Sequence, residues 1–219
     1  MKRRSLFNSG LVFLLAALLL TGISFSAGTV SAADEDSGDM LAMLSKELKL
    51  SDEQTKKLGP AIQKFVNTID QLKADQEKED AEPDALVKGA KTAQEELDKE
   101  LQEIFTPDQF KQFNAMKEKA LKGMFNDLAE IQLMDLQPKV GFSDDQLTQL
   151  VPILGGGLYQ VVTIAWEHAG KHMRMGQKIK LAKKLKHIQK ESRDAVSKVL
   201  TPEQLQTWDK IKEQAKKNK

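Results

Sequence analysis

The sequence contains no cysteine, and this absence excludes several classes of protein. Without thiols the chain cannot form disulfides, hold thiolate metal sites, use a cysteine nucleophile or carry the lipid anchor of a bacterial lipoprotein. Aromatic residues are also scarce, at 5% of the chain, with two Trp and one Tyr. A protein of this composition must be held together by the packing of aliphatic side chains.

The N-terminal segment has the layout of a secretory signal peptide. Basic residues at positions 2–4 precede an apolar core at residues 11–20, and small residues follow at 30–33. We therefore predict a signal peptide over residues 1–32 and a mature protein in the periplasm, without a stable membrane span after cleavage. The alternative is an uncleaved anchor, because the uncharged run over residues 5–33 is long enough to span a bilayer.

The mature chain is rich in Lys, Glu, Gln, Leu and Ala, the composition of long amphipathic helices. Its charge is divided unevenly along the sequence. Residues 34–120 contain 13 basic and 21 acidic side chains, whereas residues 121–219 contain 17 basic and 11 acidic ones. Opposite signs favour contact between the two halves, and the basic half can also attract acidic partners.

A short motif typical of a helix start occurs four times. In each copy a large apolar residue precedes Ser or Thr, and Gln follows three residues later. The hydroxyl can accept from the backbone of the first turn, while the Gln side chain can reach back to the backbone of the cap residue. The predicted capping pairs are Ser51 with Gln54, Thr106 with Gln109, Ser143 with Gln146, and Thr201 with Gln204.

The spacing of these motifs indicates an internal duplication. The first and third copies lie 92 residues apart, the second and fourth lie 95 apart, and neighbouring apolar positions share these offsets. We predict an all-α protein built from two tandem repeats of an antiparallel helical hairpin: an acidic repeat over residues 33–140 and a basic repeat over 141–219.

Apolar residues between the motifs follow helical steps of three and four, and over residues 86–104 they form a narrow seam of the coiled-coil type. Pro60 and Pro152 occupy equivalent positions, 92 residues apart. Each proline predicts either a bent helix or the start of a new one.

A cap of the form Leu-Thr-x-x-Gln, present in pairs in a secreted protein without cysteine, resembles the signature of the Spy/CpxP family, also called the LTXXQ family. Leu200, Thr201 and Gln204 match the motif as written, whereas Phe105 and Phe142 replace its Leu in two other copies. The resemblance implies periplasmic helical hairpins that dimerise into a curved cradle. It also implies an ATP-independent chaperone or an envelope-stress accessory protein, and some members of that family bind metal ions.

One pair of histidines has the spacing of a metal site. His168 and His172 lie four residues apart, so on a continuous helix they would share a face and could hold Zn, Ni or Cu. Gly170 weakens such a helix, and the nearby basic residues oppose cation binding. The alternative is a turn between two helices that happens to carry polar side chains.

A second unusual stretch, residues 151–166, has no charge and contains a Gly-Gly-Gly triplet. Three glycines weaken a helix, so the triplet must serve close helix packing, a break, or an adaptable apolar surface. Core packing and a surface for clients or membranes both remain open. With the lysine-rich segment that follows, the predicted client surface comprises Leu154, Leu158, Tyr159, Val162, Trp166, Lys183, Lys184 and Lys186.

No arrangement of residues predicts catalysis: nucleophile triads, phosphate loops and paired carboxylates in a pocket are not detectable in the sequence. Nucleic-acid binding is not expected either, because the lysine-rich segment has no interleaved aromatics that could stack on bases. The sequence favours a non-enzymatic binding protein for unfolded or envelope proteins, without a cofactor and, by the resemblance, able to form a homodimer. A metal sensor or buffer is the alternative, and a purely structural scaffold is a third.

Overall fold

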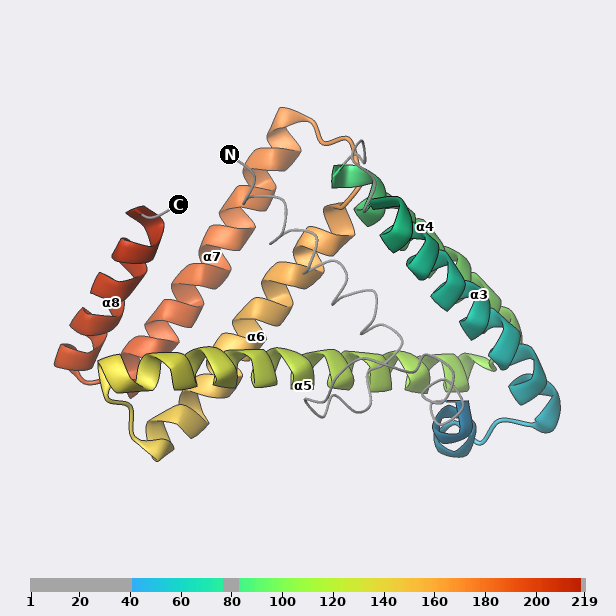
Figure 1. The fold of residues 1–219 in the computed structure, drawn as a ribbon, viewed down its shortest axis with the longest axis horizontal. Coiled ribbons are helices and arrows are strands. Elements are labelled where there is room, and N and C mark those ends of the chain that lie inside the picture. Colours follow the sequence, from blue (N-terminus) through green and yellow to red (C-terminus); the bar gives the residue numbers. More distant parts are fainter. Residues whose placement is uncertain (1–40, 77–82, 218–219) are drawn as a thin grey trace. The chain divides into compact units, whose positions relative to one another are not determined.

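The computed structural model describes residues 41–76 and 83–217, and the predicted signal peptide lies outside them. The all-α prediction is confirmed, because these residues form helices joined by short connections and contain no strand. A short helix over residues 41–47 precedes the longer ones shown in Figure 1. Their bounds are α3 Asp52–Gln76, α4 Pro83–Ile104, α5 Pro107–Val140, α6 Asp144–His168, α7 Met175–Val199 and α8 Pro202–Lys217.

Proline does not interrupt these helices. α3 continues through Pro60 and α6 through Pro152, so the alternative that a new helix begins at each proline is wrong. Pro138 likewise lies inside the last turn of α5. That helix ends at Val140 because Gly141 has a φ of 74°, a left-handed conformation that terminates helices and that glycine adopts without steric cost.

The chain divides into two compact units. Unit 1 comprises the chain up to Leu121 together with His168–Gly170, and unit 2 comprises Lys122–Glu167 and Lys171–Lys219. The division falls within α5, whereas the predicted repeat boundary between residues 140 and 141 coincides with the end of that helix.

In unit 1, α3 and α4 pack side by side along the apolar seams predicted from their sequences (Figure 1). Gly89 on α4 permits this approach, since a Cβ there would lie 2.5 Å from a methyl group of Leu72 on α3. Large apolar side chains at helical steps on both helices have exposed fractions of 7% or less. They are Leu58, Ile62, Phe65 and Ile69 on α3, and Leu86, Leu97 and Leu101 on α4.

In unit 2 a separate core forms where the C-terminal end of α5 meets α6, α7 and α8. Leu133 and Leu150 are fully buried in it, and Phe142 packs edge-on against Trp208 with ring centroids 5.8 Å apart. Val196 and Leu200 complete this core from α7 and the residue that follows it. Phe142 and Leu200 are the apolar residues that precede the third and fourth cap motifs, so the caps lie at the edge of the core.

Candidate functional site: the capped helix ends and the α6–α7 surface

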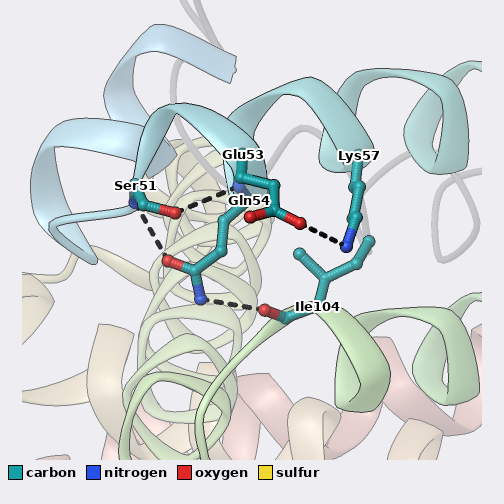
Figure 2. A network of polar contacts seen from close by, with 5 residues as sticks. All are labelled: Ser51, Glu53, Gln54, Lys57 and Ile104. Atoms are coloured by element: carbon teal, nitrogen blue, oxygen red, sulfur yellow. Dashed lines mark hydrogen bonds and ion pairs between the residues drawn. The ribbon is translucent and has the colours of Figure 1, made fainter.

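All four cap motifs form both hydrogen bonds of a capping box. At the first, the Ser51 amide donates to Gln54 Oε1 at 2.9 Å, and the Gln54 amide donates to Ser51 Oγ at 3.2 Å (Figure 2). The other three caps repeat this pair of bonds with distances of 2.9–3.3 Å. Each cap satisfies backbone N–H groups that have no partner within the helix.

The glutamines also join the caps in pairs. In unit 1, Gln54 Nε2 donates to the carbonyl of Ile104 at 2.8 Å and to Gln109 Oε1 at 2.7 Å (Figure 2 shows the first of these bonds). Gln109 Nε2 forms the reciprocal pair of bonds: it donates to the carbonyl of Leu48 at 3.1 Å and to Gln54 Oε1 at 3.4 Å. We call this four-bond arrangement a glutamine clasp.

Unit 2 has a glutamine clasp built in the same way, with one carbonyl partner shifted by one residue. The carbonyl that Gln204 uses lies two residues before the cap residue of the opposing motif, whereas the carbonyl that Gln109 uses lies three residues before it. Gln146 Nε2 donates to the carbonyl of Val199 at 2.9 Å and to Gln204 Oε1 at 2.8 Å. Gln204 Nε2 donates to the carbonyl of Gly141 at 2.7 Å and to Gln146 Oε1 at 3.0 Å. Each amide thereby uses two donor hydrogens and two acceptor positions, which is the full capacity of a glutamine side chain.

Charge supports two of these helix starts. The pKa of Glu203 lies below its ordinary value because its carboxylate accepts hydrogen bonds from its own backbone and from the Thr201 side chain. The pKa of Glu53 is lowered by its hydrogen bond and ion pair with Lys57, whose Nζ lies 2.9 Å from Glu53 Oε1 (Figure 2). Both carboxylates also lie at the positive end of a helix dipole. No substrate-binding or catalytic group is needed to account for these shifts.

The glycine triplet lies inside α6 and permits close packing on two sides within unit 2. A Cβ at Gly155 would lie 2.8 Å from Cα and 2.9 Å from N of Asn126 on α5, so the two backbones are nearly in contact. A Cβ at Gly157 would lie 2.5 Å from Ser192 Oγ on α7, while Gly156 has open space around it. Of the three explanations for the triplet, close packing therefore holds at Gly155 and Gly157.

The predicted client surface is only partly accessible. Val162 is buried, with 5% of its surface exposed, so its assignment to a surface is wrong: this residue belongs to the packed face of α6. The remaining predicted apolar residues are half-buried, and the lysines are exposed. The half-buried set is Leu154, Leu158, Tyr159 and Trp166, and the exposed set is Lys183, Lys184 and Lys186.

The histidine pair does not have the helical geometry that the prediction assumed. α6 ends at His168, and Gly170 has a φ of 68°, which is typical of the residue that terminates a helix. Residues 171–174 are not helical, so His172 is not one helical turn beyond His168. Within the described ranges no group of three or more His, Asp or Glu side chains is positioned to hold a metal ion. The turn between two helices, the alternative given by the sequence, is what this segment forms.

Two features of the structure were not anticipated from the sequence. The first is the exposure of large apolar side chains on helices of unit 2: Ile131 and Met134 on α5, and Met175 and Ile179 on α7, with exposed fractions between 50% and 73%. The second feature is the meeting of the two glutamines of each clasp. The sequence does hold a hint of this pairing. Gln recurs at the same position of every cap although Glu would cap equally well, and only Gln can also donate hydrogen bonds.

Of the helices in the described part of the chain, α6 alone is long and apolar enough to cross a membrane, by length and composition only. Packed helices of soluble proteins pass the same criterion, and the contacts at Gly155 and Gly157 show that α6 packs against its neighbours.

Comparison with known proteins identifies one region of similarity. Residues 33–113 match the model of a family described as a domain of unknown function (DUF4890), a region that contains the first two caps and the glutamine clasp of unit 1. No curated protein and no solved structure matches the chain.

Proposed function

We propose that the protein is a non-enzymatic binding protein of the cell envelope, a Spy-like chaperone or envelope-stress accessory that acts without ATP. The observation that carries this proposal is the surface of unit 2 on α6 and α7, two helices that approach each other closely at Gly157 and Ser192 (Figure 1). α6 contributes half-buried apolar side chains, and α7 contributes exposed lysines. A partly apolar, basic surface suits those unfolded segments that expose apolar residues and carry negative charge.

The glutamine clasps add support to the resemblance on which the proposal also rests. They give the Leu-Thr-x-x-Gln pairs a shared structural purpose, in which two caps fasten the ends of one helical unit. Because both units have the same clasp, we interpret residues 33–140 and 141–219 as two copies of one unit within a single chain. On this interpretation function resides where the copies differ, on α6 and α7, rather than in the caps.

An aggregation assay tests the proposal. The chain beginning at Asp34 is added in stoichiometric excess to several unrelated unfolding clients in the absence of nucleotide, and light scattering follows their aggregation. We expect a delay for most clients. A Lys183→Gln, Lys184→Gln variant should protect acidic clients less well, whereas the exposed pair Lys111→Gln, Lys119→Gln on α5 provides a control with the same charge change.

Failure to delay any client would reject the chaperone proposal. Equal losses in the lysine variant and its control would show that net charge, rather than the α7 surface, determines binding. The metal-sensor alternative is tested separately by calorimetric titration with Zn, Ni and Cu. Because the helical spacing of His168 and His172 is absent, we expect their double replacement by Ala to leave any metal affinity unchanged.

A further inference from the structure

α7 consists of two halves that differ in their surroundings. Its buried residues, Ile188 and Val196, both lie in the C-terminal half. Between residues 175 and 187 no side chain is buried, and only Leu181 and Leu185 are half-buried. The N-terminal half of α7 is therefore a helix with most of its circumference facing solvent.

This exposed half carries a short apolar stripe. Met175 is 73% exposed and Ile179 is 50% exposed, and their spacing of four residues places them on one face of the helix. Ala182, also exposed, continues that face. Lys178 and Lys186 lie on the same side, since each is three or four residues from a member of the stripe. Exposed large apolar side chains bordered by lysines are a pattern typical of helices that lie in a membrane interface.

The charge around the stripe has one sign. Residues 171–190 contain eight Lys and Arg side chains and no Asp or Glu, and all eight are exposed. None of them forms an ion pair with another residue in the part of the chain that the structure describes. Such a concentration of cations repels itself, and an anionic surface that approaches it relieves the repulsion.

We propose that the N-terminal half of α7 docks on the surface of an anionic phospholipid bilayer, with Met175 and Ile179 entering the interface and the lysines facing the headgroup phosphates. The exposed half, residues 175–187, is about 20 Å long, so it can lie flat along several headgroups at once. Lysine ammonium groups act as point charges that do not require a fixed partner geometry, which suits a fluid array of phosphates. This site shares Lys186 with the proposed client surface, but client binding is measured without lipid and vesicle binding without clients, so each proposal can fail separately.

An acidic protein segment is the other anionic partner of comparable charge. The exposed Met175 and Ile179 favour the membrane, because a purely electrostatic partner would leave these side chains in water. The distinction is testable, since only the membrane requires both the apolar stripe and the lysines.

Co-sedimentation with vesicles tests the proposal, using the chain that begins at Asp34 and thus keeps every described residue. We expect binding to phosphatidylcholine vesicles that contain about one third phosphatidylglycerol, weak binding to pure phosphatidylcholine, and a decline with salt. Each lysine near an anionic surface contributes roughly fivefold to the partition coefficient, so Lys178→Gln, Lys186→Gln should lower it roughly 25-fold. The variant Met175→Gln, Ile179→Gln should also lower the partition coefficient, by roughly tenfold or more. The reason is that two partly inserted apolar side chains no longer leave water when the helix binds.

Matched controls separate this site from general charge and apolarity. Lys111→Gln, Lys119→Gln removes the same charge from α5, and Ile131→Gln, Met134→Gln removes comparable exposed apolar surface. Both should bind vesicles as the unmodified chain does, and circular dichroism should be unchanged in all variants. Equal losses in the test and control variants would overturn the proposal, as would the absence of any preference for phosphatidylglycerol. Tight binding of polyglutamate that is indifferent to Met175 and Ile179 would assign the surface to an acidic protein segment instead.

Discussion

Adjacent glycines in α6 should respond in opposite directions to the same substitution. Gly155→Ala places a methyl group 2.8 Å from Cα and 2.9 Å from N of Asn126, closer than such atoms approach in real structures. Gly156→Ala places the same group in open space. Both substitutions exchange glycine for alanine inside a helix, so they share the gain in helix propensity and differ only in packing.

The magnitudes follow from these distances. Alanine gains about 1 kcal/mol over glycine in a helix interior, and Gly156→Ala should realise that gain. Overpacking costs about 1–3 kcal/mol, and the upper value applies at Gly155 because the obstructing atoms belong to the backbone of α5 and cannot rotate away. Gly155→Ala should therefore lose about 2 kcal/mol net, which separates the two variants by roughly 3 kcal/mol.

Thermal and urea unfolding followed by Trp fluorescence measure this difference. Both tryptophans of the chain, Trp166 and Trp208, lie in unit 2, so the signal reports on the unit that contains α6. A separation of 3 kcal/mol corresponds to roughly 6–12 °C in the melting temperature for a chain of this size. If Gly155→Ala proved as stable as Gly156→Ala, the close approach of α5 and α6 would be refuted.

Double variants refine the test. In Gly157→Ala the new Cβ would lie 2.5 Å from Ser192 Oγ, which is too close, and 3.6 Å from Ser192 Cβ, which is an ordinary contact. Adding Ser192→Ala removes the obstructing oxygen and should restore the stability of the Gly157→Ala variant. Asn126→Ala removes the Oδ1 contact at Gly155 but leaves the backbone contact, and it should therefore restore little. Rescue at one position and not at the other would distinguish side-chain from backbone obstruction.

Three further predictions concern the clasp, the pH dependence and the core. In Gln204→Glu the side chain can still accept the capping bond from the Thr201 amide, but it cannot donate to Gly141 or Gln146. Urea unfolding should therefore show a loss of about 1–3 kcal/mol in the free energy of unfolding. If the glutamine served only as a cap, the variant would show no loss. Because the pKa of Glu203 is lowered in the folded state, its contribution to stability is complete above its ordinary value of 4.5 and disappears as the pH falls through the folded pKa. Urea midpoints should thus fall less on acidification in Glu203→Gln than in the unmodified chain, and an identical fall would contradict the assignment. Leu133→Ala should lower the free energy of unfolding by about 2–5 kcal/mol, because Leu133 is fully buried. Its neighbour Met134 is 57% exposed, so Met134→Ala should change that free energy by no more than about 0.5 kcal/mol. Similar losses at both positions would disprove the inward orientation of this face of α5.

Local patterns in the sequence were sufficient to predict the helices and their caps. A hydroxyl residue followed three positions later by Gln forms its two bonds within one turn, so no knowledge of the rest of the fold is needed at Ser51 or Thr201. The apolar seam of α4 was predictable for the same reason, since its spacing of three and four residues already defines one buried face.

Features that depend on distant residues were not predictable in this way. The recurrence of Gln in every cap is a hint of a shared role, but the sequence around Gln54 does not identify Gln109 as the partner of its amide, because that contact depends on how the intervening hairpin folds. Val162 was assigned to a surface because residues 151–166 carry no charge that would distinguish an outer from an inner face. His168 and His172 failed as a pair because Gly170 adopts a left-handed conformation and ends the helix, a choice that the sequence permits but does not require. The signal peptide, the duplication and the client surface stay predictions.

The glutamine clasps have a consequence for the order of folding events. Gln54 and Gln109 are 55 residues apart, and Gln146 and Gln204 are 58 apart, so each clasp closes a long loop whose entropy must be lost before any bond is gained. Hydrogen bonds of that kind form late, after the helices and their apolar contacts have brought the chain ends together. Weakening a clasp should then leave the refolding rate almost unchanged and accelerate unfolding instead. The clasps would thus determine the lifetime of the native state through the unfolding rate, rather than serve as sites at which folding begins.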